Sequence, residues 1–258
     1  MKKTYFDLTG QAALVTGCST GLGVQMARAL ASQGCNIVAV ARREEKIREV
    51  AAQIETEFGV EALPLRCDIT DTERVEQVVK ETLDHFGRLD ILINNAGTGS
   101  IGKAEELTDE QFMRELDVDL FGTFRVSRAV VSRAMIPAGY GRIINIASIY
   151  GLVGNKIAPS SPYHAAKGGV VNLTRALAAE WGSHGITVNA ICPGYFWTPL
   201  TQQTLETQWF TDYAHSVIPM ERYGREGELD TAALFLASPA SSYVTGIMVP
   251  VDGGYTAM

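Results

Sequence analysis

The chain has 258 residues, of which 46% are hydrophobic and 20% charged, and this composition excludes collagen-like, disordered and disulfide-scaffold proteins. Its net charge of −7 argues against nucleic acid and anionic membrane surfaces as partners. The chain reaches Asp7 and Gly10 before any apolar run develops, so we expect no signal peptide. The longest uncharged stretch, 231–251, contains several Ser, Pro, Thr and Gly residues, so we expect no membrane span. The cysteines and histidines lack the spacing of metal ligands, and we expect no metal and reduced thiols in a cytoplasmic protein.

Seven short apolar runs, rich in β-branched residues, alternate with stretches of helical periodicity. The predicted strands are 12–16, 37–41, 63–67, 89–94, 142–147, 187–192 and 247–251. Between the second and third of them, one face of a helix carries Ile47, Val50, Ala51, Ile54 and Phe58. Strands without polar alternation that are separated by helices indicate a parallel sheet covered on both faces. We therefore predict a single doubly wound α/β domain over residues 1–258.

The first predicted strand leads through a glycine-rich turn into a helix, with the sequence Thr16-Gly17-Cys18-Ser19-Thr20-Gly21-Leu22-Gly23. Glycines in such a turn let a ligand approach the backbone, and the free N–H groups at the helix start attract phosphate. In the first βαβ unit the pattern predicts a dinucleotide site, with tight helix–strand packing as the alternative reason for the glycines. The predicted cofactor contacts in this turn are Gly17, Ser19, Thr20, Gly21, Leu22 and Gly23.

The second predicted strand ends in Ala41, Arg42 and Arg43, where an enzyme that uses NAD usually carries an acidic residue for the ribose 2′-OH. The guanidinium groups of Arg42 and Arg43 suit a 2′-phosphate by their charge and by their planar donor fork. The alternative is that both arginines pair with Glu44 and Glu45 on the surface. We predict NADP(H) rather than NAD(H) as the cofactor.

Tyr163 and Lys167 are four residues apart, one above the other on a predicted helix that Ser161 caps. A free phenol has a pKa of about 10 and is a poor base near neutral pH unless a cation stabilises its ionised form. Lys167 supplies that cation, and Ser148 ends the fifth predicted strand at the edge where open α/β sheets bind ligands. We predict Ser148, Tyr163 and Lys167 as catalytic residues. A Tyr packed on its helix beside a solvated Lys is the alternative.

Residues 198–222 lack a strand pattern and are rich in aromatic side chains, directly after Tyr195, Phe196 and Trp197. A long aromatic insertion near a sheet edge predicts a substrate lid, and a helical hairpin packed on the core is an equal alternative. An aromatic lid favours a bulky apolar ketone, such as a steroid or a bile acid.

As a set, the motifs of this chain resemble those of the short-chain dehydrogenase/reductase family, in its common branch of about this length. Besides the glycine turn, the matching residues are Cys67-Asp68-Ile69, Asn94-Asn95-Ala96-Gly97, Ser148, Tyr163 with Lys167, Pro193-Gly194-Tyr195-Phe196-Trp197-Thr198 and Val251-Asp252-Gly253-Gly254. The resemblance implies a Rossmann-like seven-stranded sheet, NAD(P)(H) binding, and reversible hydride transfer between nicotinamide and a carbonyl or alcohol. It also implies a homotetramer.

The same resemblance implies further cofactor contacts. Asp68 would contact the adenine, Asn95 the ribose region and Lys167 the nicotinamide ribose, while residues 193–198 would contact the nicotinamide carboxamide. The remaining contacts implied by the motifs are Ile69, Ala96, Gly97, Pro193, Gly194, Phe196 and Thr198.

The chain departs from the family pattern in the long helix after the fourth strand, where Asp119 stands in place of the usual Asn. In the family, that Asn helps a backbone carbonyl to hold a water that contacts the catalytic Lys. Asp119 either preserves the carbonyl geometry or binds Lys167 and changes its pull on Tyr163. We predict that Asp119 belongs to a functional proton relay with a shifted pH optimum.

Within the family, the segment 190–196 and the C-terminal Val251-Asp252-Gly253-Gly254 most resemble gluconate 5-dehydrogenase-like members, which implies a sugar acid as substrate. Lys156 and Arg222 are candidates to bind its carboxylate. A hydroxysteroid or bile-acid dehydrogenase and a 3-oxoacyl reductase are alternatives. The connection between Ser148 and Tyr163 is longer than the family commonly shows, which bears on specificity.

A hypothesis of another class is a catalytically silent redox sensor that binds NADP(H). The presence of Ser148, Tyr163 and Lys167 argues against it. We therefore predict an NADP(H)-dependent enzyme that interconverts a secondary alcohol and a ketone of a small-molecule substrate.

Overall fold

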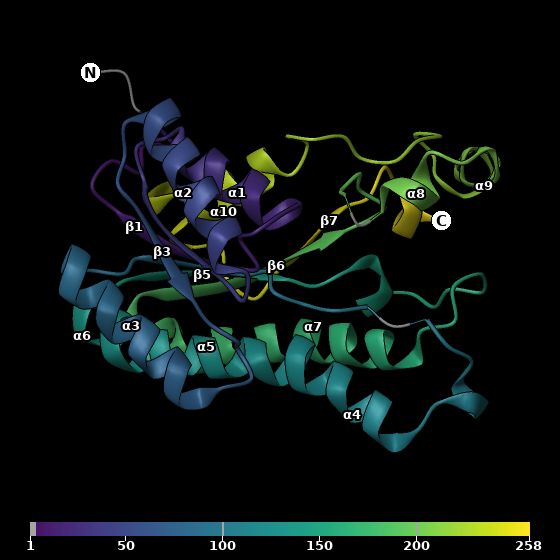
Figure 1. The fold of residues 1–258 in the computed structure, drawn as a ribbon, viewed down its shortest axis with the longest axis horizontal. Helices are drawn as coiled ribbons and strands as arrows, with labels where there is room; N and C mark the ends of the chain where they lie inside the picture. The colour runs from purple at the N-terminus through teal and green to yellow at the C-terminus, as the bar shows by residue number, and fades with distance from the viewer. Residues whose placement is uncertain (1–3, 100, 200) are drawn as a thin grey trace.

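The computed structural model describes residues 4–99, 101–199 and 201–258, and its seven strands form one parallel sheet (Figure 1). The strands are β1 (Ala12–Thr16), β2 (Asn36–Ala41), β3 (Ala62–Arg66), β4 (Ile91–Asn94), β5 (Gly141–Ile146), β6 (Ile186–Pro193) and β7 (Met248–Val251). Their order is β3-β2-β1-β4-β5-β6-β7, and every neighbouring pair is parallel. The predicted Rossmann-like, doubly wound fold is confirmed. Residue 200 of the expected lid lies outside the described residues, as do 1–3 and 100 of the expected domain.

Helices cover both faces of the sheet (Figure 1). Their bounds are α1 (Leu22–Ala31), α2 (Glu44–Phe58), α3 (Thr72–Phe86), α4 (Asp109–Leu116), α5 (Gly122–Val130), α6 (Ile136–Ala138), α7 (Ser161–Trp181), α8 (Gln202–Leu205), α9 (Gln208–Val217) and α10 (Asp230–Ala237). α1, α2 and α10 lie on one face, and α3, α5 and α7 on the other. None of these helices is long and apolar enough to cross a membrane.

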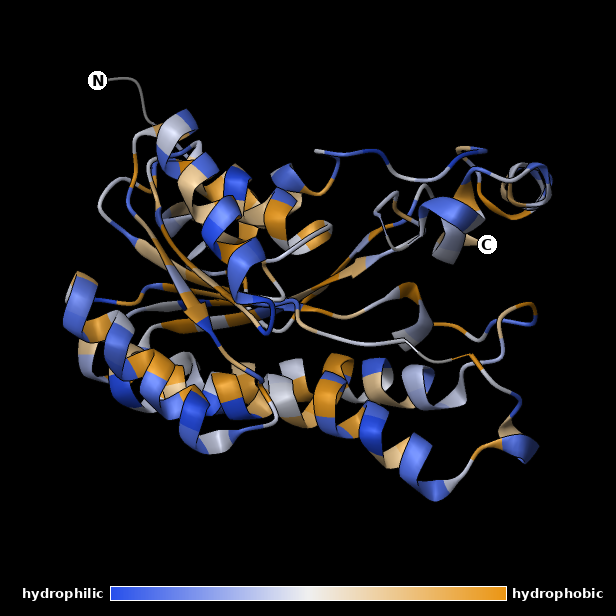
Figure 2. Ribbon diagram, in the orientation of Figure 1, coloured by the Kyte–Doolittle hydropathy of each residue, from blue (hydrophilic) through white to orange (hydrophobic). Residues whose placement is uncertain are grey.

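The amphipathic pattern of the sequence places the core where it was expected. The buried residues of α2 are Ile47, Val50, Ala51 and Ile54, and Phe58 is only partly buried against the same core. In Figure 2 the apolar residues run along the central strands, whereas α4 carries mostly hydrophilic residues. The chain thus buries two apolar layers, one on each side of the sheet.

The topology sets the location of the ligand site. β1 pairs with β2 on one side and with β4 on the other, so the order of the strands reverses between β1 and β4. Ligands of open α/β sheets bind beyond the carboxyl ends of the strands at such a switch point. The side chain of Thr16, at the end of β1, accepts hydrogen bonds from the backbone N–H groups of Asn95 and Ala96 at 2.9 and 3.0 Å. This contact joins the loops that follow β1 and β4.

Asp230 is the first residue of α10, and its ionised carboxyl lowers the free energy of unfolding at neutral pH. Burial above all, with the nearby Glu226 carboxylate, raises the pKa of its carboxyl to about 6. Because the folded-state pKa exceeds that of the unfolded chain, folding is opposed increasingly as the pH rises from about 4 through 6. We expect Asp230→Asn to raise the free energy of unfolding at pH 8 by ~1 kcal/mol and to leave it unchanged at pH 4. Urea denaturation at the two pH values measures this, and an equal effect at both would contradict it.

Candidate active site

The turn between β1 and α1 has the backbone conformation that its glycines permit. Gly17 and Gly21 have φ angles of +67° and +66°, in the region that favours glycine. A Cβ atom at Gly17 would lie 2.6 Å from Asn95 Nδ2, and one at Gly23 would lie 2.5 Å from the same atom. Asn95 Nδ2 donates to the Thr16 carbonyl at 3.0 Å. The glycines therefore serve close packing as well as the approach of a ligand, and Asn95 holds the turn in place.

The start of α1 fits a dinucleotide diphosphate. The N-cap of α1 is Gly21, and no side chain caps the first turn, so its N–H groups can donate to an anion. Arg43 donates to Ser19 Oγ at 2.8 Å and to Thr20 Oγ1 at 3.0 Å, which places a guanidinium beside the turn. Neither arginine of the pair is found in a salt bridge with Glu44 or Glu45 among the described residues. The Arg43 guanidinium, the two hydroxyls and the uncapped N-terminus of α1 together suit the phosphate groups of a nucleotide.

Asp68 and Ile69 follow β3 at the same edge of the sheet. Asp68 Oδ1 accepts hydrogen bonds from the N–H and hydroxyl of Thr70 at 3.0 and 2.8 Å. Burial alone would raise the pKa of Asp68, but these hydrogen bonds and the nearby Arg42 outweigh it, and the pKa is lowered. The Ile69 side chain is buried, and a Cβ at Gly122 would meet its Cδ1 at 2.6 Å. Ile69 therefore faces the core, so only its backbone is left to meet a cofactor.

Lys167 is held inside the protein by three elements. It is 4% exposed on α7, and its Nζ donates to the Ile146 carbonyl at the end of β5 at 3.1 Å. The same Nζ lies 3.1 Å from Asp119 Oδ2, and Asp119 is fully buried. Burial alone would lower the pKa of Lys167, but the Asp119 carboxylate above all, with Tyr163 and the buried Glu115, raises it above its usual value. Lys167 is therefore a permanent cation at physiological pH.

Asp119 lies in a π-helical turn, Asp117–Phe121, between α4 and α5. Its Oδ1 accepts from the Thr98 N–H at 2.7 Å, and a Cβ at Gly97 would lie 2.9 Å from its Oδ2. The carboxylate thus fixes the loop after β4 while pairing with Lys167. Of the two roles open to this residue from the sequence, the structure shows the pairing with Lys167. π-turns of this kind are frequent at functional sites.

Tyr163 lies in the first turn of α7, with its ring centroid 5.4 Å from Lys167 Nζ. The capping prediction is wrong by one residue, because Ser160 occupies the N-cap position and Ser161 is already helical. Ser148 Oγ accepts from the Tyr150 N–H at 3.1 Å, and the Tyr150 ring packs edge-on against the Tyr163 ring at 6.1 Å between centroids. The predicted catalytic residues therefore share one neighbourhood, which Tyr150 links.

The segment after β6 connects the glycine turn to an aromatic cluster. A Cβ at Gly21 would lie 3.3 Å from Thr198 Cγ2, which brings Thr198 to the start of α1. Phe196 is buried. Gly194 packs against Asp252 and donates its N–H to the Val251 carbonyl at 2.9 Å.

The expected lid contains the helices α8 and α9. Their buried side chains form a separate apolar cluster of Leu205, Phe210, Ala214 and Ile218. The cluster is separate from the two core clusters beside the sheet, and both the lid and the hairpin packed on the core stay predictions.

Several residues around this cluster were not predicted from the sequence. Tyr150, Asn155 and Tyr213 contact the Tyr195 hydroxyl through their polar groups, and Tyr255 contacts the Tyr213 hydroxyl. The only sequence signal was the density of aromatic residues near 195–213. They come together because four separate segments fold to the same end of the sheet.

The two cations suggested for a substrate carboxylate differ in their surroundings. Arg222 is engaged by Glu228 through two hydrogen bonds of 2.7 Å, which hold the pKa of Glu228 at about 2. Arg222 is therefore not free to bind a substrate carboxylate, because the Glu228 carboxylate already occupies its guanidinium donors. Lys156 is exposed, and among the described residues it has no ion-pair partner.

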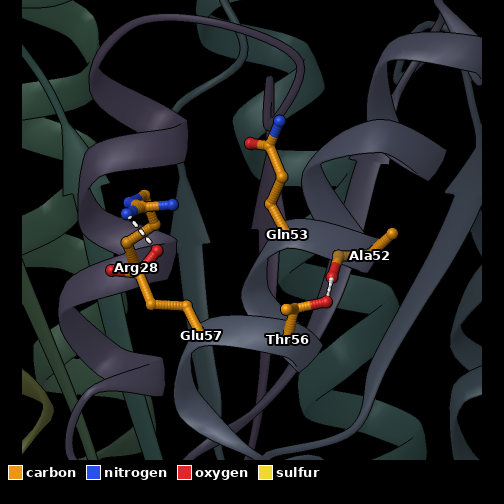
Figure 3. A pocket seen from close by; sticks show the side chains of 5 residues that line it. All are labelled: Arg28, Ala52, Gln53, Thr56 and Glu57. Atoms are coloured by element: carbon orange, nitrogen blue, oxygen red, sulfur yellow. Dashed lines mark hydrogen bonds and ion pairs between the residues drawn. The ribbon is translucent and has the colours of Figure 1, made fainter.

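A hollow on the outer side of α1 and α2 does not belong to this site. It is lined by Arg28, Ala52, Gln53, Thr56 and Glu57 (Figure 3). Several of its polar side chains bind one another or the backbone. Arg28 pairs with Glu57 at 2.5 Å, and Thr56 Oγ1 donates to the Ala52 carbonyl at 2.8 Å. It lies on the exposed surface of helices and holds none of the predicted catalytic residues.

Comparisons with known proteins agree with the geometry. The family model described as enoyl-(acyl carrier protein) reductase matches residues 17–256. The chain belongs to the short-chain dehydrogenase/reductase family. It is 38% identical over 254 residues to galactitol 2-dehydrogenase (L-tagatose-forming) of Cereibacter sphaeroides, with 98% of both chains covered. It is 38% identical over 251 residues to gluconate 5-dehydrogenase of Gluconobacter oxydans, with 97% of this chain and 96% of the relative covered.

A solved structure supports the same relationship. The gluconate 5-dehydrogenase of Burkholderia cenocepacia, in complex with NADP and tartrate, matches with a TM-score of 0.93 and 36% identity over 98% of each chain. This short-chain dehydrogenase/reductase is therefore an oxidoreductase with the fold of a family that uses NAD(P)(H).

Proposed function

We propose that the enzyme interconverts a secondary hydroxyl and a ketone on a sugar acid or a related polyol, with NADP(H) as cofactor. The buried ion pair that holds Lys167 beside Tyr163 carries this proposal. The relatives named for gluconate and galactitol support the substrate class.

The residues of this chain divide the chemistry among them. When bound, the dinucleotide supplies or accepts the hydride. Ser148 Oγ binds the substrate oxygen, and Tyr163 passes a proton to or from it. The Lys167 ammonium lies beside the Tyr163 ring, and the Ile146 carbonyl and Asp119 fix it there. The ionised phenol then acts as base for alcohol oxidation, and the neutral phenol as acid for ketone reduction.

Several further features belong to this proposal. Residues 198–222 act as the substrate lid, and the chain acts in the cytoplasm, which its four buried and unpaired cysteines support. The enzyme is a homotetramer, a state supported by the family resemblance and by the exposed side chains of Met113 and Phe121 on the α4–α5 stretch. Light scattering coupled to gel filtration measures the mass of the assembly.

The function is tested by binding followed by turnover. NADPH is titrated by fluorescence, and turnover is then measured on 5-ketogluconate, galactitol, a 3-oxoacyl thioester and an oxo-bile acid with both NADP(H) and NAD(H). Turnover highest on the first two supports the proposal. Turnover confined to the thioester or the bile acid contradicts it, and cofactor binding without turnover on any of them indicates a redox sensor.

Cofactor preference is expected to depend on the arginine pair. Arg42→Ala and Arg43→Ala should each raise the KM for NADPH about 10- to 100-fold, because each removes a charge-assisted contact to the 2′-phosphate. The KM for NADH should change less than about three-fold. Arg48→Ala is the matched control, since Arg48 pairs with Glu44 on the exposed side of α2. Equal effects on both cofactors would contradict a role in selecting the phosphate.

A further inference from the structure

Four tyrosine hydroxyls form a continuous chain next to the catalytic residues. The oxygens of Tyr150 and Tyr195 are 3.0 Å apart, those of Tyr195 and Tyr213 are 3.3 Å apart, and those of Tyr213 and Tyr255 are 3.2 Å apart. Tyr150 follows β5, Tyr195 follows β6, Tyr213 lies on α9, and Tyr255 lies in the C-terminal turn. In Figure 1 the C-terminus lies beside α8, at the end of the sheet where β6 leads into this region.

The Asn155 side chain donates hydrogen bonds to the two tyrosines at one end of this chain of hydroxyls. Its Nδ2 donates to the oxygen of Tyr150 and, at 2.9 Å, to that of Tyr195. Its Oδ1 accepts from the backbone N–H groups of Ile157 and Ala158 at 2.6 and 3.1 Å. Asn155 therefore has no hydrogen-bonding capacity left, and it acts as a support for the two phenols.

The tyrosine hydroxyls, unlike the Asn155 side chain, can still form further hydrogen bonds. Each phenol has one O–H donor, so the four have one donor more than the three contacts between them consume. Tyr195 is saturated, since it contacts Tyr150, Tyr213 and Asn155. The spare donor and the spare lone pairs thus belong to Tyr150, Tyr213 and Tyr255. Reversing the direction of the O–H bonds moves the spare donor from one end of the chain to the other.

The hydroxyls are neutral and partly accessible. Burial raises the pKa of Tyr213 and of Tyr255 to about 12, so both phenols keep their protons at physiological pH. Their side chains are half-buried, as is that of Tyr150. The Tyr150 ring also touches the Tyr163 ring, and its N–H donates to Ser148 Oγ. The chain of hydroxyls therefore begins beside the catalytic residues and leads away from them.

We propose that the hydroxyls of Tyr150, Tyr213 and Tyr255 bind the hydroxyl-bearing carbon chain of the substrate and select polyhydroxylated compounds. This inference rests on the proposed function, since it concerns the part of the substrate remote from the reacting carbon. A substrate hydroxyl both donates and accepts, as the reversible phenol chain requires. An apolar ring system such as a steroid would cover the same hydroxyls without giving them partners, which is unfavourable.

The test removes single hydroxyls and keeps the rings. The full-length variants Tyr213→Phe and Tyr255→Phe are compared with the wild type and with the control Tyr243→Phe, whose side chain is fully exposed. The probes are gluconate, galactitol and cyclohexanol, each oxidised with saturating NADP⁺. Gluconate and galactitol differ in the carboxylate, and cyclohexanol offers a single hydroxyl.

We expect both variants to raise the KM for gluconate and for galactitol about ten-fold with little change in kcat, because the lost contact is remote from the reacting atoms. The kcat/KM for cyclohexanol and all constants of Tyr243→Phe should match the wild type. Unchanged KM values for the polyhydroxylated substrates overturn the inference, as does an equal loss on cyclohexanol, which would indicate a structural role. A loss confined to gluconate overturns it too, because the phenols would then bind the carboxylate.

Failure of the proposed function gives a different result. If the wild type oxidises cyclohexanol and neither gluconate nor galactitol, the proposed function fails. If it oxidises them and the variants behave like the wild type, only this inference fails. A binding measurement covers the case without turnover: galactitol should raise the Tm of the wild-type complex with NADP⁺ and should do so less in both variants. The absence of any such rise in the wild type also overturns the inference.

Discussion

Tyr163→Phe should lower kcat about 1,000-fold and leave the Kd for NADPH within about two-fold of the wild type. The phenol is the group that exchanges a proton with the substrate oxygen, and phenylalanine keeps the ring against Tyr150 while removing the acid and base. Fluorescence titration measures binding of NADPH, and initial rates with 5-ketogluconate measure turnover. The two readouts separate loss of chemistry from loss of the cofactor site.

Tyr140→Phe is the matched control for this variant. Tyr140 precedes β5 at the amino end of the sheet, where its hydroxyl contacts Gln11 Oε1 at 3.3 Å. Its removal should leave both readouts unchanged. Substantial turnover by Tyr163→Phe would mean that another group handles the proton, and the assignment of Tyr163 would have to be abandoned.

Asp119→Asn should move the alkaline limb of the pH–rate profile for alcohol oxidation down by at least about one pH unit. Asp119 is the strongest of the groups that raise the pKa of Lys167, and without it burial favours the neutral amine. Lys167 then loses its charge at a lower pH, and the cation beside the Tyr163 ring is lost with it. The profile is measured from pH 6 to pH 11 at saturating NADP⁺.

The pair of Asp119 and Lys167 also makes the free energy of unfolding depend on pH. Because the folded-state pKa of Lys167 is raised, its contribution to the free energy of unfolding is fully present below the unfolded value of about 10.4 and is lost as the pH rises through the folded value.

Asp117→Asn is the control for the pH–rate profile, since Asp117 lies in the same π-turn but pairs with Arg125 at 2.6 Å. An unchanged profile in Asp119→Asn, or the same shift in Asp117→Asn, would refute the assignment to Asp119.

The fold could be predicted almost entirely because its signals are local. β-branched runs and helical periodicity depend on neighbouring residues, and each predicted strand agrees with the structure to within two residues. The cap of α7 was misplaced by one residue, since both Ser160 and Ser161 are suitable and packing decides between them. β4 begins at Ile91, two residues later than expected, although the Asp90 backbone already bonds to Ala12 and Arg142 in the flanking strands.

The proposed catalytic pair could be named from the sequence because Tyr163 and Lys167 lie one helical turn apart, a relation that needs no tertiary information. Their surroundings could not, because charges and hydroxyls from distant segments meet only after folding. The pairing of Asp119 with Lys167, the pairing of Arg222 with Glu228 and the contacts between tyrosine hydroxyls join residues between 6 and 48 positions apart. The sequence by itself therefore determined the sheet, the glycine turn and the acid–base pair, and only the tertiary structure decided which groups surround them.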